Sequence, residues 1–218
     1  MDFNGFANSD FDFFKKKDKM SKVDYEEGRK NLKTHFRGLC YEIQKLYYKE
    51  HSVPFYIEKE FQNFSKRSTS INAMHDVENS PIKLNLLLNE EGIYNIIELS
   101  NEIPVIDILS NKKKDIISFI TSSRNRFIKA DLNLKSKNKN IIKLNSYEMS
   151  DKNFDNLCAN LSESIKNGKE VSSHIGYFYS KSECVKQGKD FLNTAYGSVL
   201  ELLKFSNKLE QWHNREVF

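Results

Sequence analysis

Glycine, proline and cysteine are scarce in this sequence of 218 residues, which contains eight Gly, three Pro and three Cys. This composition excludes a collagen-like chain, a low-complexity chain and a small domain held together by disulfides. No apolar run approaches the roughly 20 residues needed to cross a bilayer, which excludes a transmembrane helix. We therefore expect a soluble globular protein.

Several motifs that identify enzyme and metal-binding classes are also missing. The glycines are isolated, so there is no phosphate loop or dinucleotide fingerprint, and no Gly-x-Ser-x-Gly elbow occurs. Cys40, Cys158 and Cys184 are too far apart to form a zinc knuckle or a redox pair. Residues 1–14 lack the apolar segment of a secretory signal. We expect no cofactor, no metal site and a reducing, cytoplasmic location.

Aromatic residues are abundant, with 16 Phe and 10 Tyr, and they can fill a sizeable core. Five phenylalanines fall within the first 14 residues, ahead of the lysine run 15–17. We expect residues 1–20 to form an N-terminal appendage packed on the core.

An apolar stripe predicts a long helix that follows this appendage. Asp24 can cap the helix, with Glu27 three residues on, as in a capping box. Apolar residues then recur at steps of four and three residues, which is the period of an amphipathic helix. The members of the stripe are Leu32, Phe36, Leu39, Ile43 and Leu46. Pro54 disfavours helix at the residue before it, so the helix should end there.

The remaining segments predict strands and helices in alternation. Residues 82–88 and 93–99 flank a turn that ends in Gly92, which predicts a hairpin. Residues 104–109 are predicted as a further strand that begins at its proline. Later segments predict helices over 111–126, 151–166 and 180–213, and strands over 127–134, 141–144 and 173–179.

This order of elements predicts an α+β fold. We expect a single domain over residues 1–218, with an antiparallel sheet built from hairpins and helices packed on it. Long helices should lie near both ends of the chain.

Several short motifs together resemble the YktB-like family of uncharacterised bacterial proteins. They are Phe3-x-Gly5-Phe6, Asp10-Phe11-x-Phe13, Lys66-Arg67-Ser68-Thr69, the hairpin 82–99, and His174-Ile175-Gly176 followed by a long helix. The paired arginines of the family are Lys66 and Arg67 here, and the Pro-Pro and Trp expected just after them are absent. The resemblance implies a compact α+β fold, and it implies neither an established activity nor catalytic residues.

Positive charge is concentrated between Lys112 and Lys143. The whole chain has a net charge of +4, yet this stretch has ten basic and two acidic residues. The basic residues are Lys112, Lys113, Lys114, Arg124, Arg126, Lys129, Lys135, Lys137, Lys139 and Lys143. Such clusters bind phosphates through charge and counterion release, and Tyr147 and the run Tyr177-Phe178-Tyr179 can stack on exposed bases. A solvated lysine-rich face without a ligand is the alternative interpretation.

Two patterns suggest phosphodiester cleavage instead. Arg29 and His35 lie six residues apart on the long helix, where the Arg can stabilise phosphate charge and the His can transfer protons. Asp76 and Glu78, near Glu98, are candidate ligands for a catalytic metal.

Our leading hypothesis is a non-enzymatic binding protein of the bacterial or phage cytoplasm. It would contact nucleic acid or another acidic partner through the surface formed by residues 112–143. The alternatives are a phosphodiester-cleaving enzyme and a protein–protein adaptor.

Overall fold

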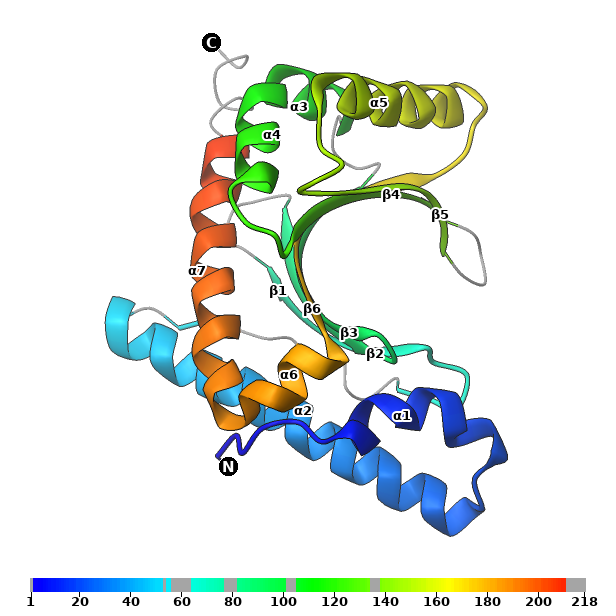
Figure 1. The fold of residues 1–218 in the computed structure, drawn as a ribbon, viewed down its shortest axis with the longest axis vertical. Helices are drawn as coiled ribbons and strands as arrows, with labels where there is room; N and C mark the ends of the chain where they lie inside the picture. The colour runs from blue at the N-terminus through cyan, green and yellow to red at the C-terminus, as the bar shows by residue number, and fades with distance from the viewer. Residues whose placement is uncertain are drawn as a thin grey trace. The chain divides into compact units, whose positions relative to one another are not determined.

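An antiparallel sheet is the centre of the fold in a computed structural model that describes residues 2–52, 54–55, 64–76, 82–100, 105–133 and 138–210. The strands are β1 (Ser70–Asp76), β2 (Lys83–Asn89), β3 (Gly92–Ser100), β4 (Arg126–Asn133), β5 (Asn138–Asn145) and β6 (Val171–Ser180). They form one six-stranded sheet in the order β1-β2-β3-β6-β4-β5 (Figure 1).

Seven α-helices and two 3₁₀ turns are present among the described residues. They are α1 (Asn8–Lys16), η1 (Lys17–Lys19), α2 (Lys22–His51), α3 (Val105–Asn111), α4 (Lys113–Thr121), α5 (Asp151–Lys166), α6 (Lys181–Gln187), η3 (Gly188–Asp190) and α7 (Phe191–Glu210). The predicted α+β class, with long helices near both ends, is confirmed.

The chain divides into two compact units, each assembled from separate segments. The first contains Met1–Asp76, Asn85–Asn95 and Tyr179–Glu201, and the second contains Val77–Leu84, Ile96–Phe178 and Leu202–Phe218. We describe the packing of each unit separately.

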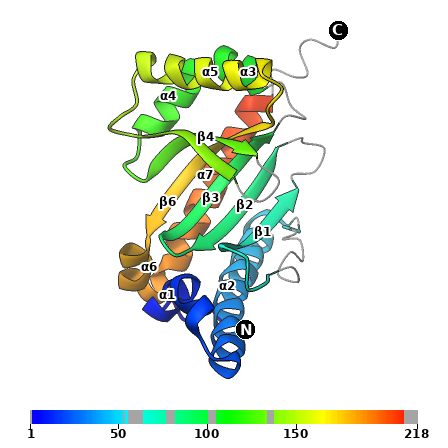
Figure 2. The same cartoon turned by 90° about the vertical axis from the view of Figure 1, so that its right-hand side faces the viewer.

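In the first unit, α1 lies beside α2, as Figures 1 and 2 both show. The phenylalanines of the N-terminal segment are buried. They are Phe3, Phe6, Phe11, Phe13 and Phe14. Phe6 packs edge-on against Phe191 of α7, with ring centroids 6.1 Å apart. Burial of these large rings supplies much of the apolar stabilisation of this unit.

The N-cap of helix α2 lies three residues before the capping position predicted from the sequence. Ser21 is the N-cap, and its hydroxyl accepts a hydrogen bond from the Asp24 amide over 3.1 Å. A serine hydroxyl satisfies an amide of the first turn as well as an aspartate does. The helix ends at His51, and the amide of the C-cap residue Ser52 donates to the Tyr48 carbonyl. Four of the five residues of the predicted stripe, Leu32, Phe36, Leu39 and Ile43, are inaccessible to solvent, whereas Leu46 is half-buried.

The helix predicted from residue 180 onward is interrupted at Gly188. Its φ of +55° lies in the left-handed region, which ends α6 and separates it from α7. Gly5 approaches Gly188 so closely that a Cβ on Gly5 would lie 2.6 Å from the Gly188 carbonyl carbon. The break in the helix therefore accommodates the N-terminal segment.

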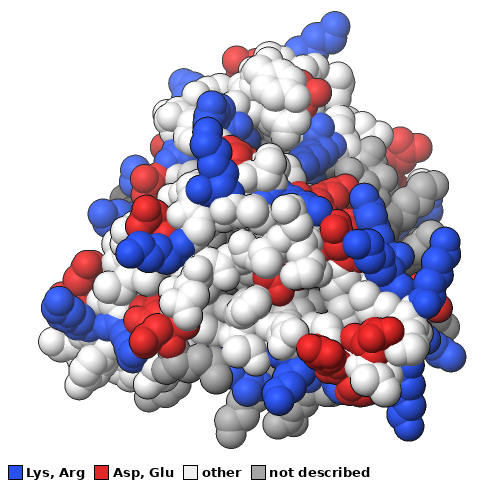
Figure 3. Space-filling view, turned by 60° about the horizontal axis from the view of Figure 1, so that its bottom comes forward, with Lys and Arg blue, Asp and Glu red and all other residues white. Residues whose placement is uncertain are grey.

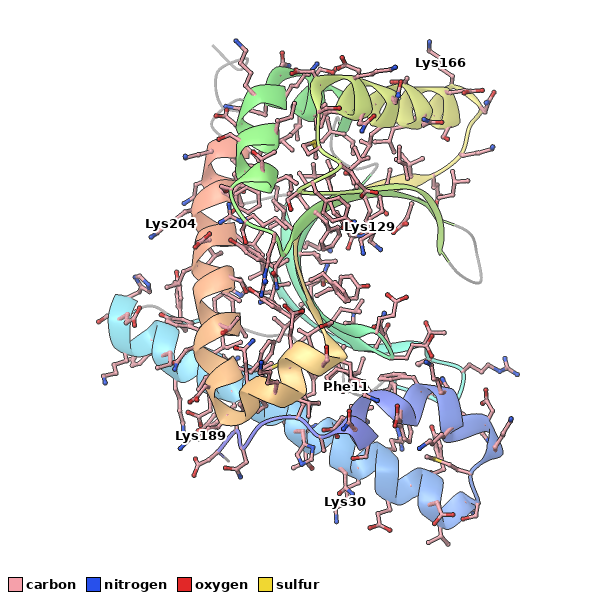
Figure 4. All side chains as sticks on the ribbon, viewed as in Figure 1. Phe11, Lys30, Lys129, Lys166, Lys189 and Lys204 are labelled. Atoms are coloured by element: carbon pink, nitrogen blue, oxygen red, sulfur yellow. The ribbon has the colours of Figure 1, made fainter. Side chains whose placement is uncertain are left out.

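In the second unit, α4 and α5 contact the strands β4 and β5. Strand β4 pairs with β5 on one side and with β6 on the other, and both pairings are antiparallel. Phe119 of α4 stacks on Phe205 of α7 with ring centroids 4.1 Å apart. In Figure 4, Lys129 projects from β4 on the side opposite to α5. The helices therefore cover one face of these strands, and Lys129 lies on the other.

The strand predicted at 104–109 is wrong, because Val105–Asn111 forms α3. Val105, Ile108 and Leu109 are buried, and their spacing of three and four residues is helical. A short apolar run does not distinguish a strand from a helix, and proline is favoured at the first position of a helix as well as tolerated at a strand edge.

Candidate functional site

Helix α2 carries a row of positive charges on one side. Arg29, Lys30, Lys33 and Arg37 are spaced so that they share a side of a helix with 3.6 residues per turn. Residues 28–41 include no Asp or Glu. We call these four residues the cationic face of α2. Lys30 projects from the helix on the side away from α1 (Figure 4).

The cationic face borders a surface hollow of about 310 Å³. The residues that line it are Glu26, Arg29, Lys30, Lys33, Thr34 and Arg37. The lining therefore combines four cations and a hydroxyl with a single carboxylate. Cationic and hydroxyl donors are the side chains that most often contact phosphate oxygens.

Arg29 is held in place at one wall of this hollow. Its Nε and Nη2 atoms donate to the Phe64 carbonyl over 3.2 and 2.9 Å. Its Nη1 atom lies 3.4 Å from a carboxylate oxygen of Glu26. The one acidic residue of the hollow is thus already paired with Arg29.

The pKa of Lys33 is lowered, in part by the neighbouring positive charges. Burial lowers the pKa of this half-buried amine, the charges of Arg29 and Arg37 lower it further, and Glu26 partly opposes them. Like charges four residues apart also destabilise a helix by about 0.2–0.5 kcal/mol per pair. The cationic face therefore has a cost in the free protein that a bound anion would relieve.

Positive charge does not dominate the face of the molecule that Figure 3 shows. Figure 3 shows a face on which Lys and Arg side chains are interspersed with Asp and Glu side chains. A cluster of cations must therefore be located residue by residue.

The lysines at the start of α4 belong to the basic stretch predicted from the sequence. Lys113 lies 2.7 Å from Asp155 and 3.2 Å from Asp151, both on α5. The hydrogen bond to Asp155 raises the pKa of Lys113. Its charge is therefore neutralised within the protein, whereas Lys114 is exposed and Lys112 is half-buried.

Arg126 is buried within the second unit. Its guanidinium carbon lies 4.0 Å from the Phe119 ring centroid and 4.9 Å from that of Tyr177. It donates to the Tyr177 hydroxyl, the Phe119 carbonyl and the Ser122 hydroxyl. Arg126 thus stabilises the packing of α4 on the sheet, while Arg124 is exposed on the preceding turn.

Lys129 and Lys143 face each other across β4 and β5. They lie on the opposite side of the sheet from Arg126, because successive side chains of a strand alternate. The Lys129 amine is 2.8 Å from a carboxylate oxygen of Asp131, its neighbour two residues along. The fold therefore divides the basic residues of β4 between two faces.

Lys143 packs against aromatic rings. The Lys143 amine lies about 5 Å above the rings of Phe127 and Phe178. Lys135, Lys137 and the side chain of Lys139 lie outside the described residues. Among the described residues, the structure does not bring the predicted stretch together as one cationic patch.

A separate cluster of ionisable groups joins three strands of the second unit. The Nδ1 atom of His174 on β6 is 3.2 Å from Asp131 on β4, and its Nε2 atom is 3.9 Å from Glu98 on β3. Burial alone would raise the pKa of Asp131, but His174 and Lys129 outweigh it and hold that pKa below its usual range. The cluster places the Asp131 carboxylate against the Lys129 amine and the His174 ring, which suits a structural role.

Arg29 and His35 do not form a shared site. Arg29 contacts Phe64, whereas the Nδ1 atom of His35 lies 2.9 Å from a carboxylate oxygen of Asp10 on α1. Asp10 is buried and also accepts from the Ala7 amide. The His35 contact therefore fastens α1 to α2.

The carboxylates suggested as metal ligands are not gathered by the described structure. Asp76 ends β1, Glu78 lies outside the described residues, and Glu98 contacts His174. Among the described residues, no group of three or more His, Cys, Asp or Glu side chains is placed to hold a metal ion.

Burial keeps the three cysteines unreactive. It raises the pKa of Cys158 to about 11 and that of Cys184 to about 12, and the pKa of fully buried Cys40 is higher still. The thiolate, the reactive form, is therefore scarce at neutral pH. All three are free thiols.

No protein-family model matches this chain, and no curated protein matches it. The resemblance to the YktB-like family stays a prediction. Across the described part of the chain, no helix combines the length and the apolar character needed to cross a membrane.

The sequence prediction missed Lys30, Lys33 and Arg37. The signal was available, because residues 28–41 contain four basic residues and no acidic one. Residues 112–143 contain more basic residues, so the sequence prediction placed the binding surface there instead.

Proposed function

We propose that the protein binds nucleic acid through the cationic face of α2. The contacts are electrostatic and largely independent of base sequence. The observation that carries the proposal is the hollow of about 310 Å³ in which four cations meet a single carboxylate.

The cost of the cationic face to the free protein supports a binding role. Lys33 lies between Arg29 and Arg37, one helical turn from each, and both lower its pKa. A fold that used these residues only for solubility would gain stability by spacing them apart. Local departures from the rules of helix stability are typical of functional sites.

A repeating polyanion fits this face better than a single anion does. The cations extend over about 12 Å of helix from Arg29 to Arg37. Phosphates recur every 3.4 Å or so along one stacked strand, so several can be contacted together. The hollow's lining also includes no histidine among the described residues, which favours binding over cleavage.

The test is fluorescence-anisotropy binding to short DNA and RNA at several salt concentrations. We expect the logarithm of the binding constant to fall linearly with the logarithm of the salt concentration. For a single strand the slope should be no steeper than about −2.8, which corresponds to four phosphate contacts. Lys33→Gln should reduce the steepness of the slope by about 0.7. Lys114→Gln, an exposed lysine of the sequence-predicted stretch, is the matched control and should leave the slope unchanged.

Polyglutamate of similar charge is the second arm of this experiment. Binding of polyglutamate with the same affinity would show a general acidic-partner surface and would contradict nucleic-acid recognition. The absence of DNA and RNA binding at low salt would overturn the proposal.

A further inference from the structure

The cationic face of α2 continues along the helix into two exposed tyrosines. Tyr41 is 45% exposed and Tyr48 is 60% exposed, although most aromatic side chains of the described structure are buried. Tyr41 follows Arg37 by four residues and Tyr48 follows it by eleven. At about 100° per residue, both lie within about 40° of Arg37 around the helix axis. The tyrosines and the cations therefore occupy one side of α2.

From this arrangement we infer that the site binds single-stranded nucleic acid, with phosphates on Lys30, Lys33 and Arg37 and unpaired bases stacked on Tyr41 and Tyr48. The inference rests on the proposed function and specifies its ligand. Cationic grooves with neighbouring aromatic platforms are typical of proteins that bind single strands.

The distances along the helix suit a single strand. Lys30 and Tyr48 are 18 residues apart, or about 27 Å of helix. At the 3.4 Å spacing of a stacked strand, that length corresponds to about eight nucleotides. The two tyrosines are about 10 Å apart along the axis, which leaves room for a base on each ring.

The surroundings of Tyr41 keep its ring in place. The Lys45 amine lies 4.6 Å from the ring centroid and is also paired with Glu42 at 2.8 Å. Lys45 occupies one face of the ring, so the opposite face is the one offered to a base. A duplex presents its phosphates to the cations but keeps its bases stacked inside, so the tyrosines add nothing to duplex binding.

The experiment compares a 12-nucleotide single strand, a 12-base-pair duplex and an abasic single strand of the same length by fluorescence anisotropy. The double variant Tyr41→Ala/Tyr48→Ala should bind the single strand at least about tenfold more weakly, because one stacked base contributes about 5- to 150-fold. Its affinity for the duplex and for the abasic strand should change less than about twofold. The wild-type protein should bind the abasic strand about as weakly as this variant binds the intact strand.

Two control variants accompany this measurement. Tyr41→Phe/Tyr48→Phe keeps both rings and should retain wild-type affinity. Tyr147→Ala removes a tyrosine that is 81% exposed in the second unit and should have no effect. Circular dichroism of each variant checks that α2 is intact.

The outcomes separate this inference from the proposed function. If Lys30→Gln/Lys33→Gln weakens binding to both strands and duplex while the alanine variant of the tyrosines does not, the inference fails and the proposed function stands. If the wild-type protein binds neither nucleic acid, both fail. Equal affinity of the wild-type protein for the intact and abasic strands also overturns the stacking inference.

Discussion

The cationic face of α2 and the basic stretch 112–143 both consist of lysines and arginines, but these residues have different neighbours in the two regions. On α2, Lys33 lies between two arginines, and the one carboxylate of the hollow is paired with Arg29. In the stretch, Lys113 is paired with two aspartates and Lys129 with a third. The stretch has more basic residues in sequence, but the four basic residues of α2 line a single hollow.

This difference shows why the density of lysine along a chain is a poor guide to a binding surface. A cation that meets a carboxylate or an aromatic ring within the fold contributes to packing, as Arg126 does. A cation kept beside like charges lowers the stability of the free protein and gains from an external anion. Mutation of the first kind should therefore lower the free energy of unfolding, whereas mutation of the second kind should raise it and weaken binding.

The largest effect on stability is expected at Arg126. Arg126→Ala should lower the free energy of unfolding by about 3 kcal/mol, because it removes charged hydrogen bonds and a stacked cation from a buried position. Urea unfolding followed by circular dichroism measures this loss. Arg124→Ala, on the exposed turn, should cost about 0.5 kcal/mol or less. A loss of nucleic-acid affinity with unchanged stability in Arg126→Ala would break the comparison.

A smaller loss is expected at the ionic cluster of the second unit. Asp131→Asn should lower the free energy of unfolding by about 2 kcal/mol at pH 7, because it leaves Lys129 and His174 without their shared carboxylate. The depressed pKa of Asp131 fixes the pH dependence. Its stabilisation is complete above the ordinary aspartate pKa of about 3.9 and is lost as the pH falls through the lower, folded-state value.

Unfolding of the wild type and Asp131→Asn at pH 6 and pH 3 provides the check. The difference between the two proteins should be smaller at pH 3 than at pH 6. A difference that grows on acidification would contradict the assigned role of the carboxylate.

Much of the fold was predictable because its elements repeat with a helical or a strand period. The stripe from Leu32 to Ile43 identified α2, and the alternation from Phe127 onward identified β4. The errors in the predicted elements occurred where a segment is too short to show a period, or where a tertiary contact interrupts the predicted element. Residues 105–111 are too few to reveal a period, and the break at Gly188 serves a contact with the distant Gly5.

The site was less predictable, because charge partners come from segments that are distant in sequence. Nothing near Lys113 indicates that Asp151 and Asp155 will neutralise it. Arg126 falls at the end of the helix predicted over 111–126 but lies on β4, so the sequence did not indicate that it and Lys129 point to opposite faces. Residues 28–41 contain basic residues but no acidic ones, which is a signal visible in the local sequence. Together with the helical period, it would have predicted the cationic face of α2.

The smallest effects are expected at single lysines, and they should differ in sign. Lys33→Gln should raise the free energy of unfolding by about 0.5 kcal/mol, since two like-charge pairs are relieved. Lys113→Gln should lower it slightly, since two exposed ion pairs are lost. Thermal unfolding at low and high salt measures both, and both differences should diminish at high salt.

The pH dependence of Lys33→Gln sharpens this comparison. The pKa of Lys33 is lowered in the folded state. Its charge therefore lowers the free energy of unfolding by the full amount when the pH is below this folded-state pKa. The effect disappears as the pH rises through the ordinary lysine pKa of about 10.4. The advantage of Lys33→Gln should therefore be present at pH 8 and absent at pH 11. An unchanged advantage at pH 11 would show that the charge of Lys33 is not its cause.

The most direct test of the account compares charge reversal at the two regions, with the same single-stranded oligonucleotide in the same buffer. Lys30→Glu/Lys33→Glu relieves repulsion, and Lys112→Glu/Lys114→Glu places acids at the start of α4, where the helix dipole favours them, so both variants should fold. The account predicts at least about tenfold weaker binding for the α2 pair and less than about twofold for the α4 pair. The opposite order would contradict it and would assign the nucleic-acid surface to the basic stretch 112–143.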